Sequence, residues 1–153
     1  MTPQTPTTSI PAFSDGTRVY LDANVLIELV ERWDAGLGRI VEDARAGRLL
    51  LVTSELTLAE VIVMPLRDGD AGLLAQYRDL FSQPELIACL PITRDVIERS
   101  GEIRATDGGK LADAIHLATA EIGGCKVFLS SDRRIRPRAP MVRIGIERIA
   151  DDT

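Results

Sequence analysis

The stretch Val19 to Ile27, VYLDANVLI, decides the fold that we expect for this chain. Residues 19–22 are typical of a buried β-strand, and apolar residues at helical spacing follow at once. Asp22 and Asn24 stand at the junction. Ligands of open parallel α/β sheets bind beyond the carboxyl ends of the strands, so an acid at this place is a candidate for a functional site. The alternative is that Asp22 only caps the helix that follows.

Strand and helix patterns continue to alternate along the 153 residues. Four further apolar strands are expected, at 49–52, 86–90, 126–129 and 141–146. Helical patterns are expected at 25–33, 39–46, 54–64 (which Pro65 would help to end), 73–81, 93–105 and 110–122, with Gly36 and Gly38 breaking the first from the second. This order predicts an α/β fold with a central, mostly parallel β-sheet flanked by helices.

The same patterns predict the domain organisation. Residues 17–149 are expected to form a single domain, because no linker or internal repeat divides them. Residues 1–16 are rich in Thr and Pro and predict a flexible N-terminal tail, and residues 150–153 form a C-terminal tail.

Three further acids occupy places that resemble that of Asp22. Glu60 lies among apolar residues on a helix that we expect to be buried, and Asp113 lies on the enclosed-looking helix 110–122. Asp132 comes just after the strand 126–129. Because an unpaired buried carboxylate costs several kcal/mol, a cluster of these four acids would need a compensating cation. The alternative is that they form internal salt bridges with arginines.

The donor types favour a hard metal ion. Carboxylates without a nearby Cys or His cluster favour Mg²⁺ or Mn²⁺ over Zn²⁺. Such an ion could orient a water and shield a phosphodiester during in-line attack. Cys89 and Cys125 lie too far apart for a compact zinc site and are expected to be buried free thiols. His116, one helical turn after Asp113, is interpreted as a structural residue.

Charge and composition limit the possible partners. A net charge of −5 argues against binding of polyanions by bulk charge, and 4% aromatic residues argue against base stacking. Locally, Arg133, Arg134, Arg136 and Arg138 crowd a short segment after Asp132, where the first three could contact RNA phosphates. A solvated loop would equally explain them. The sequence shows no signal peptide or membrane span, so a soluble, cytoplasmic protein without membrane contact is expected.

Four motifs together resemble the PIN-domain family and, within it, toxin ribonucleases of the VapC type. They are LDANVLI at 21–27, SELTLAEV at 54–61, KLADAIHLATA at 110–120 and VFLSSDRRI at 127–135. The resemblance implies a site of Asp22, Glu60, Asp113 and Asp132, which would be catalytic and would bind Mg²⁺ or Mn²⁺. It also implies supporting roles for Asn24 and Ser130.

The resemblance further implies an endoribonuclease that hydrolyses RNA phosphodiester bonds as the toxin of a toxin–antitoxin pair. Its partners would be a cognate antitoxin, the RNA substrate and a second copy of the chain. Two alternatives stay open, a PIN-fold nuclease outside any toxin pair and a non-catalytic module that binds RNA or protein. Phosphotransfer folds fit poorly, because a haloacid dehalogenase-like site would need an acid where Asn24 stands.

Overall fold

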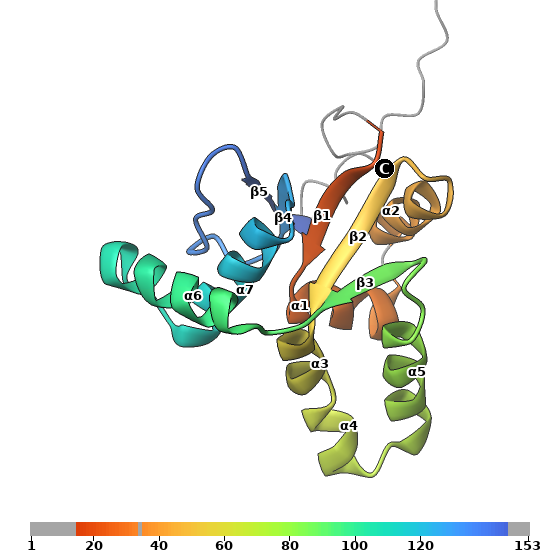
Figure 1. The fold of residues 1–153 in the computed structure, drawn as a ribbon. Helices are drawn as coiled ribbons and strands as arrows, with labels where there is room; N and C mark the ends of the chain where they lie inside the picture. The colour runs from red at the N-terminus through yellow and green to blue at the C-terminus, as the bar shows by residue number, and fades with distance from the viewer. Residues whose placement is uncertain (1–14, 34, 147–153) are drawn as a thin grey trace, which may run out of the picture.

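The computed structural model describes residues 15–33 and 35–146 (Figure 1). Apart from residues 15 and 16, the tails predicted at 1–16 and 150–153 lie outside the described residues, as do residues 147–149. The elements are β1 Thr17–Leu21, α1 Ala23–Ile27, the π-helix η1 Glu28–Arg32, α2 Ala35–Arg45, β2 Leu49–Ser54, α3 Glu55–Val61, α4 Val63–Asp68, α5 Ala71–Phe81, β3 Ile87–Leu90, α6 Arg94–Asp107, α7 Leu111–Ile122, β4 Val127–Leu129 and β5 Val142–Ile144.

The five strands form one sheet in the order β3-β2-β1-β4-β5, and every neighbouring pair is parallel. This confirms the α/β prediction. Strand β1 lies in the centre, and Val19 is in register with Leu51 of β2 and Val127 of β4. The chain leaves β1 toward β2 and β3 and later returns to add β4 and β5 on the other side. The strand order therefore reverses between β1 and β4, and the crevice beyond their carboxyl ends is where ligands bind in such sheets.

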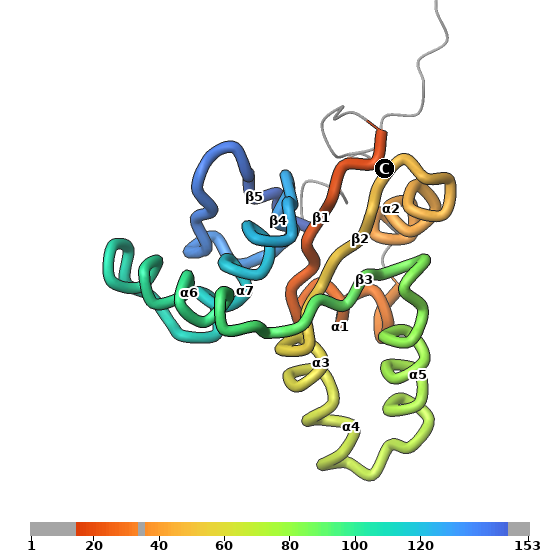
Figure 2. Tube along the Cα trace, viewed as in Figure 1, coloured from red at the N-terminus to blue at the C-terminus, as the bar shows by residue number. Residues whose placement is uncertain are grey.

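Alternation along β1 divides the core between the two faces of the sheet. Val19 and Leu21 pack with α1, η1, α2 and α5, whereas Tyr20 faces α6 and α7. The Tyr20 ring stacks on Phe128 of β4, with ring centroids 5.0 Å apart. The path of the chain in Figure 2 shows α6 and α7 on one side of the sheet, α2 and α5 on the other, and α3 beneath the strand ends.

Two predictions about the segment after β1 are wrong. Gly36 and Gly38 were expected to interrupt the helical pattern, but α2 begins at Ala35 and contains both. A β-carbon at Gly38 would lie 3.4 Å from the Trp33 ring, so the small residue lets the ring approach α2. Trp33 was expected to belong to the helical pattern 25–33, yet it is 64% exposed and its φ of 45° ends the helix.

Pro65 also acts differently from the prediction. The helical pattern 54–64 divides into α3, which ends at Val61, and α4, which begins at Val63. Pro65 lies in the first turn of α4, where a missing backbone N–H leaves no helical hydrogen bond unmade. The proline therefore allows a second short helix to begin.

Two glycines of α6, one at its C-cap and one in its interior, allow a test of where the backbone requires glycine. Gly108 caps this helix with φ 74° and ψ −152°, a conformation that only glycine adopts readily, so Gly108→Ala should destabilise the fold by about 1–3 kcal/mol. Gly101 lies within the same helix, and a β-carbon there would meet no atom within 4 Å, so Gly101→Ala should stabilise it by up to about 1 kcal/mol. Urea denaturation of both variants measures the difference, and equal effects would contradict this account of Gly108.

Candidate active site

Asp22 lies directly after the central strand and begins α1. Its Oδ1 accepts a hydrogen bond from the Val25 N–H at 3.0 Å, so Asp22 caps α1, which does not decide whether capping is its only role. The residue is only 6% exposed, and this burial raises the pKa of its carboxyl. Hydrogen bonds from Ser130 and Val25 and the charge of His116 act in the opposite direction, while the Glu60 carboxylate adds to the increase. Asp22 is thus a capping residue whose ionised form is disfavoured where it stands.

Ser130 connects the first acid with the last. The residue is fully buried beyond the end of β4, and its hydroxyl forms a hydrogen bond with the Asp22 carboxylate. Its Oγ also accepts a hydrogen bond from the Asp132 N–H at 3.1 Å. The structure therefore places Ser130 between Asp22 and Asp132, at the point where the strand order reverses.

Glu60 is less buried than the sequence predicted. Its side chain is 38% exposed, because α3 lies beneath the strand ends and packs through other residues such as Thr57 and Val61 (Figure 1). The expectation that apolar neighbours enclose this acid is wrong. Its Oε1 nevertheless lies 2.5 Å from Nε2 of His116, and its charge acts on Asp22.

The contact between His116 and Glu60 was missed at the level of sequence. His116 is 3% exposed, and its Nδ1 lies 2.6 Å from the Tyr20 hydroxyl. From the sequence, His116 was interpreted as a structural residue, and its hydrogen bond with Glu60 was not predicted. No spacing along the sequence could have shown this contact, because Glu60 and His116 lie 56 positions apart on different helices.

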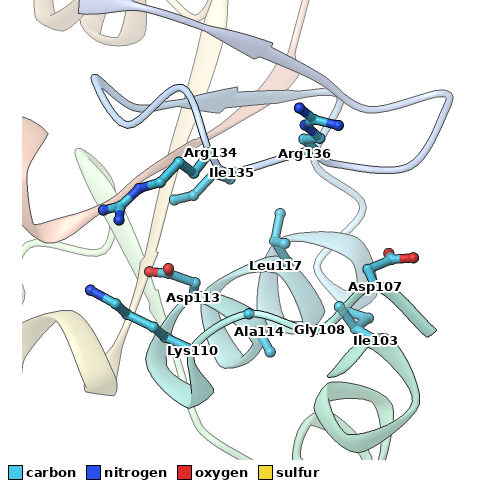
Figure 3. A pocket seen from close by; sticks show the side chains of 11 residues that line it. Ile103, Asp107, Gly108, Lys110, Asp113, Ala114, Leu117, Arg134, Ile135 and Arg136 are labelled. Carbon is cyan, nitrogen blue, oxygen red and sulfur yellow. The ribbon is translucent and has the colours of Figure 1, made fainter. Parts of the chain in front are cut away.

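Asp113 is half-buried in the first turn of α7 and lines a groove of about 600 Å³. We call it the α6–α7 groove. It runs between the end of α6, the start of α7 and residues 134–136, and Figure 3 shows the Asp113 carboxylate between the Lys110 and Arg134 side chains. Its remaining lining consists of Ile103, Asp107, Gly108, Gly109, Ala114, Leu117, Ile135 and Arg136. The groove combines basic side chains with an apolar floor.

Asp132 forms a two-pronged ion pair with Arg134. Nε and Nη2 of the guanidinium each lie 3.1 Å from a carboxylate oxygen, and the Arg134 N–H donates to Oδ1 at 2.9 Å. These hydrogen bonds lower the pKa of Asp132. Of the four acids, only Asp132 forms a salt bridge with an arginine within the described residues, so the alternative of internal salt bridges is correct for Asp132 alone.

The remaining predicted residues lie at the surface. Asn24 is exposed on α1, and Arg133 is exposed between Asp132 and Arg134. Arg136 lines the α6–α7 groove, and Arg138 instead approaches Asp107 at 3.5 Å. Cys89 and Cys125 are free thiols as predicted, but only Cys125 is buried, whereas Cys89 is half-buried. Burial raises the thiol pKa of Cys89 to about 11 and that of Cys125 to about 12, so both stay protonated at neutral pH.

The donor set suits a hard divalent ion. Asp22, Glu60, Asp113 and Asp132 offer carboxylate oxygens, and Asp22 carries a buried charge that a cation would stabilise. As the side chains stand, however, no three His, Cys, Asp or Glu side chains in residues 15–33 and 35–146 come close enough together to hold a metal ion. Glu60 is engaged by His116 and Asp132 by Arg134. The residues therefore fit an ion by chemistry, while two of them are held by other partners.

Comparison with known proteins places the chain in a family. The family model described as PIN domain matches residues 19–139, which is most of the chain. The chain belongs to the PIN domain family. No curated protein sequence matches this PIN domain. Within the described residues, no helix is long and apolar enough to cross a membrane.

Solved structures of toxin–antitoxin proteins share the fold of this PIN domain. VapBC2 from Rickettsia felis, bound to a DNA fragment from their promoter, is similar with a TM-score of 0.67 and 13% identity, covering 84% of this chain and 98% of that one. A toxin–antitoxin complex from Klebsiella pneumoniae is similar with a TM-score of 0.63 and 24% identity, covering 80% of this chain and 92% of that one. VapC20 from Mycobacterium tuberculosis, a sarcin-ricin loop cleaving toxin, is similar with a TM-score of 0.57 and 16% identity, covering 72% of this chain and 86% of that one. At these identities the likeness is one of fold.

The cost of burying Asp22 leads to a stability prediction. Asp22→Asn keeps an oxygen that can accept from the Val25 N–H but removes a charge that burial disfavours. The metal-free variant should therefore unfold about 2–4 °C higher at pH 7, which corresponds to about 1 kcal/mol.

The sign of this effect can be checked with pH. A raised pKa in the folded state means that the wild type loses stability as the pH rises through that pKa, whereas the variant lacks this loss. The gain measured by calorimetry in EDTA should thus shrink as the pH falls through the raised pKa of Asp22, and it should be absent below the usual pKa of aspartate. A lower midpoint for the variant at pH 7 would contradict the assignment of Asp22 as a costly buried charge.

Proposed function

We propose that this PIN domain is a Mg²⁺- or Mn²⁺-dependent endoribonuclease and acts as the toxin of a VapBC-type toxin–antitoxin pair in the cytoplasm. The observation that carries the proposal is the buried Asp22 carboxylate, which lies at the carboxyl ends of the central strands without an arginine or lysine partner among the described residues. Glu60 lies within electrostatic reach of Asp22, and Ser130 joins it to Asp132. The likeness in fold to toxin–antitoxin structures supports the choice of nuclease class.

Each acid has a part in this proposal. Asp22, Glu60, Asp113 and Asp132 would hold the ion, which when bound supplies positive charge for the phosphodiester and a water of lowered pKa. Asp22 is fixed by the α1 backbone and by Ser130, so its oxygens are oriented before any ligand arrives. Asn24 stands exposed on the same short helix and would support the site from its open side.

The α6–α7 groove would hold the RNA backbone next to the acids. Lys110 and Arg136 line it together with Asp113, and their positive charges suit phosphate oxygens. Arg134 has a second role beside such a contact, because its guanidinium neutralises Asp132 until another cation takes that place. Arg133 is exposed next to this pair and would contact phosphate from the rim.

The proposed partners follow from the similar structures. The Rickettsia felis and Klebsiella pneumoniae structures contain a toxin together with its antitoxin, which supports a cognate antitoxin for this chain. The cleavage of the sarcin-ricin loop ascribed to VapC20 supports RNA as the substrate class. We include a homodimer in the proposal, in keeping with the resemblance to VapC-type proteins.

Removal of Asp22 tests the proposed site. Wild type should bind Mn²⁺ in titration calorimetry and cleave a total RNA pool, and Asp22→Asn should abolish both while the fold is retained. EDTA should stop cleavage by the wild type. Asp95→Asn is the matched control, because Asp95 is an exposed acid in the first turn of α6.

The other outcomes are equally definite. Full cleavage by Asp22→Asn would remove this residue from the site, and cleavage that persists in EDTA would refute the metal requirement. A well-folded wild type that neither binds Mn²⁺ nor cleaves RNA would favour the non-catalytic interaction module.

Arg136 tests the role of the groove. If this side chain contacts a phosphate, Arg136→Ala should weaken RNA binding across sequences and lower the slope of log K against log salt by about 1. Arg94→Ala removes an exposed arginine of α6 that pairs with Glu98 and should leave the slope unchanged. Fluorescence anisotropy of a labelled RNA with the Asp22→Asn protein measures binding without cleavage, and an unchanged slope for Arg136→Ala would exclude the contact.

A further inference from the structure

A continuous series of hydrogen bonds, of which the last is partly buried and the others buried, leads from β2 to Glu60. The Tyr20 hydroxyl donates to Ser54 Oγ at 2.9 Å and lies 2.6 Å from His116 Nδ1. His116 Nε2 in turn lies 2.5 Å from Glu60 Oε1. Since an ionised carboxylate has no proton to donate, the proton in this last contact belongs to Nε2. The imidazole is therefore held at both nitrogens and presents one N–H to Glu60.

The position of this series follows from the periodicities of the elements. Tyr20 lies in β1 two residues before Asp22, whose backbone is still extended at the N-cap of α1, so alternation directs the two side chains to the same side. His116 follows Asp113 by three residues on α7, so these two share a helix face. Tyr20 and His116 contact each other directly, with ring centroids 5.7 Å apart.

The series also fixes α3 at both of its ends. Ser54 is the N-cap of α3 and accepts from the Thr57 N–H, while Glu60 lies in the last turn of the same helix. A glutamate that is 38% exposed would otherwise be free to rotate in solvent, and ordering such a long side chain costs conformational entropy. The His116 contact engages Oε1, and within the described residues no hydrogen bond engages Oε2.

We propose that His116, held in place by Tyr20, is a positioning residue that orients the Glu60 carboxylate toward the divalent ion of this site. The inference rests on the proposed function, because it assigns a role within the same metal site. His116 is 3% exposed, so each of its ring nitrogens needs a hydrogen-bond partner inside the protein. Here both ends are engaged, and one partner is a candidate ligand.

Mn²⁺ titration calorimetry measures this role apart from catalysis. His116→Leu should weaken Mn²⁺ binding about tenfold, which is the usual loss when a partner behind a metal ligand is removed. In a Glu60→Gln background the same substitution should change the affinity by no more than about twofold, because the two residues act as one unit. His116→Gln, which retains a donor, should recover part of the loss, and Tyr20→Phe, which keeps the ring that stacks on Phe128, should show a smaller loss.

Thr119→Val serves as the matched control for a general loss of stability. Thr119 is 1% exposed on the same helix, and its hydroxyl donates to Ile115 O within α7. This variant should lose stability but keep the Mn²⁺ affinity of the wild type. The thermal midpoint of every variant shows whether the fold is retained.

NMR provides a readout that needs no metal. The Nε2–H proton of His116 should be protected from exchange in the wild type, and Glu60→Ala should remove that protection. An unprotected proton, or one that Glu60→Ala leaves unchanged, would overturn the inference.

The two proposals fail in different ways. Suppose that wild type binds Mn²⁺ and cleaves RNA. If the His116→Leu protein then binds Mn²⁺ as tightly as wild type, only the positioning role is overturned. The same holds if His116→Leu lowers the Mn²⁺ affinity by the same factor in the wild-type and Glu60→Gln backgrounds. If the wild type binds no Mn²⁺ and cleaves no RNA, the proposed function is overturned and the positioning role with it.

Discussion

The burial of one carboxylate is the constraint around which the rest of the site is arranged. Asp22 follows the central strand, is almost completely enclosed, and has its pKa raised by that burial. Its remaining stabilisation comes from a backbone N–H, from the Ser130 hydroxyl and from the charge of His116. Hydrogen bonds of this kind reduce the cost of a buried charge without removing it. A divalent cation would compensate the charge, which is why we propose a metal ion at this site.

The parallel sheet explains why the groups meet at this place. Strands β1 and β4 are neighbours although more than a hundred residues separate them along the chain, so Asp22 and Ser130 come together only in the folded sheet. The strand order reverses there, and the two connections leave a crevice at the strand ends. Helices α3 and α7 border the same edge and contribute Glu60 and Asp113. The fold thereby concentrates negative charge at one end of the sheet.

Local cations and donors balance this negative charge on each side. Arg134 pairs with Asp132 and acts on Asp113, while His116 donates to Glu60. The acids therefore form two sets, one around Asp22 and one around Asp132, which Ser130 connects. In such an arrangement the metal-free protein stays folded without the full repulsion among four carboxylates. Binding of an ion would have to compete with Arg134 for Asp132, which makes the affinity depend on this arginine.

The sequence by itself determined the alternation of strands and helices, the parallel sheet and the placing of Asp22 and Asp132 after strand ends, because hydrophobic periodicity and turn residues are local signals. Tertiary structure alone decided the exposure of Glu60, the pairing of Asp132 with Arg134 and the link from Tyr20 through His116 to Glu60. It also decided that Trp33 is exposed and that Pro65 lies in the first turn of α4. These features depend on which surfaces meet across the sheet, and contacts between residues such as Glu60 and His116, 56 positions apart, leave no periodic signal along the chain.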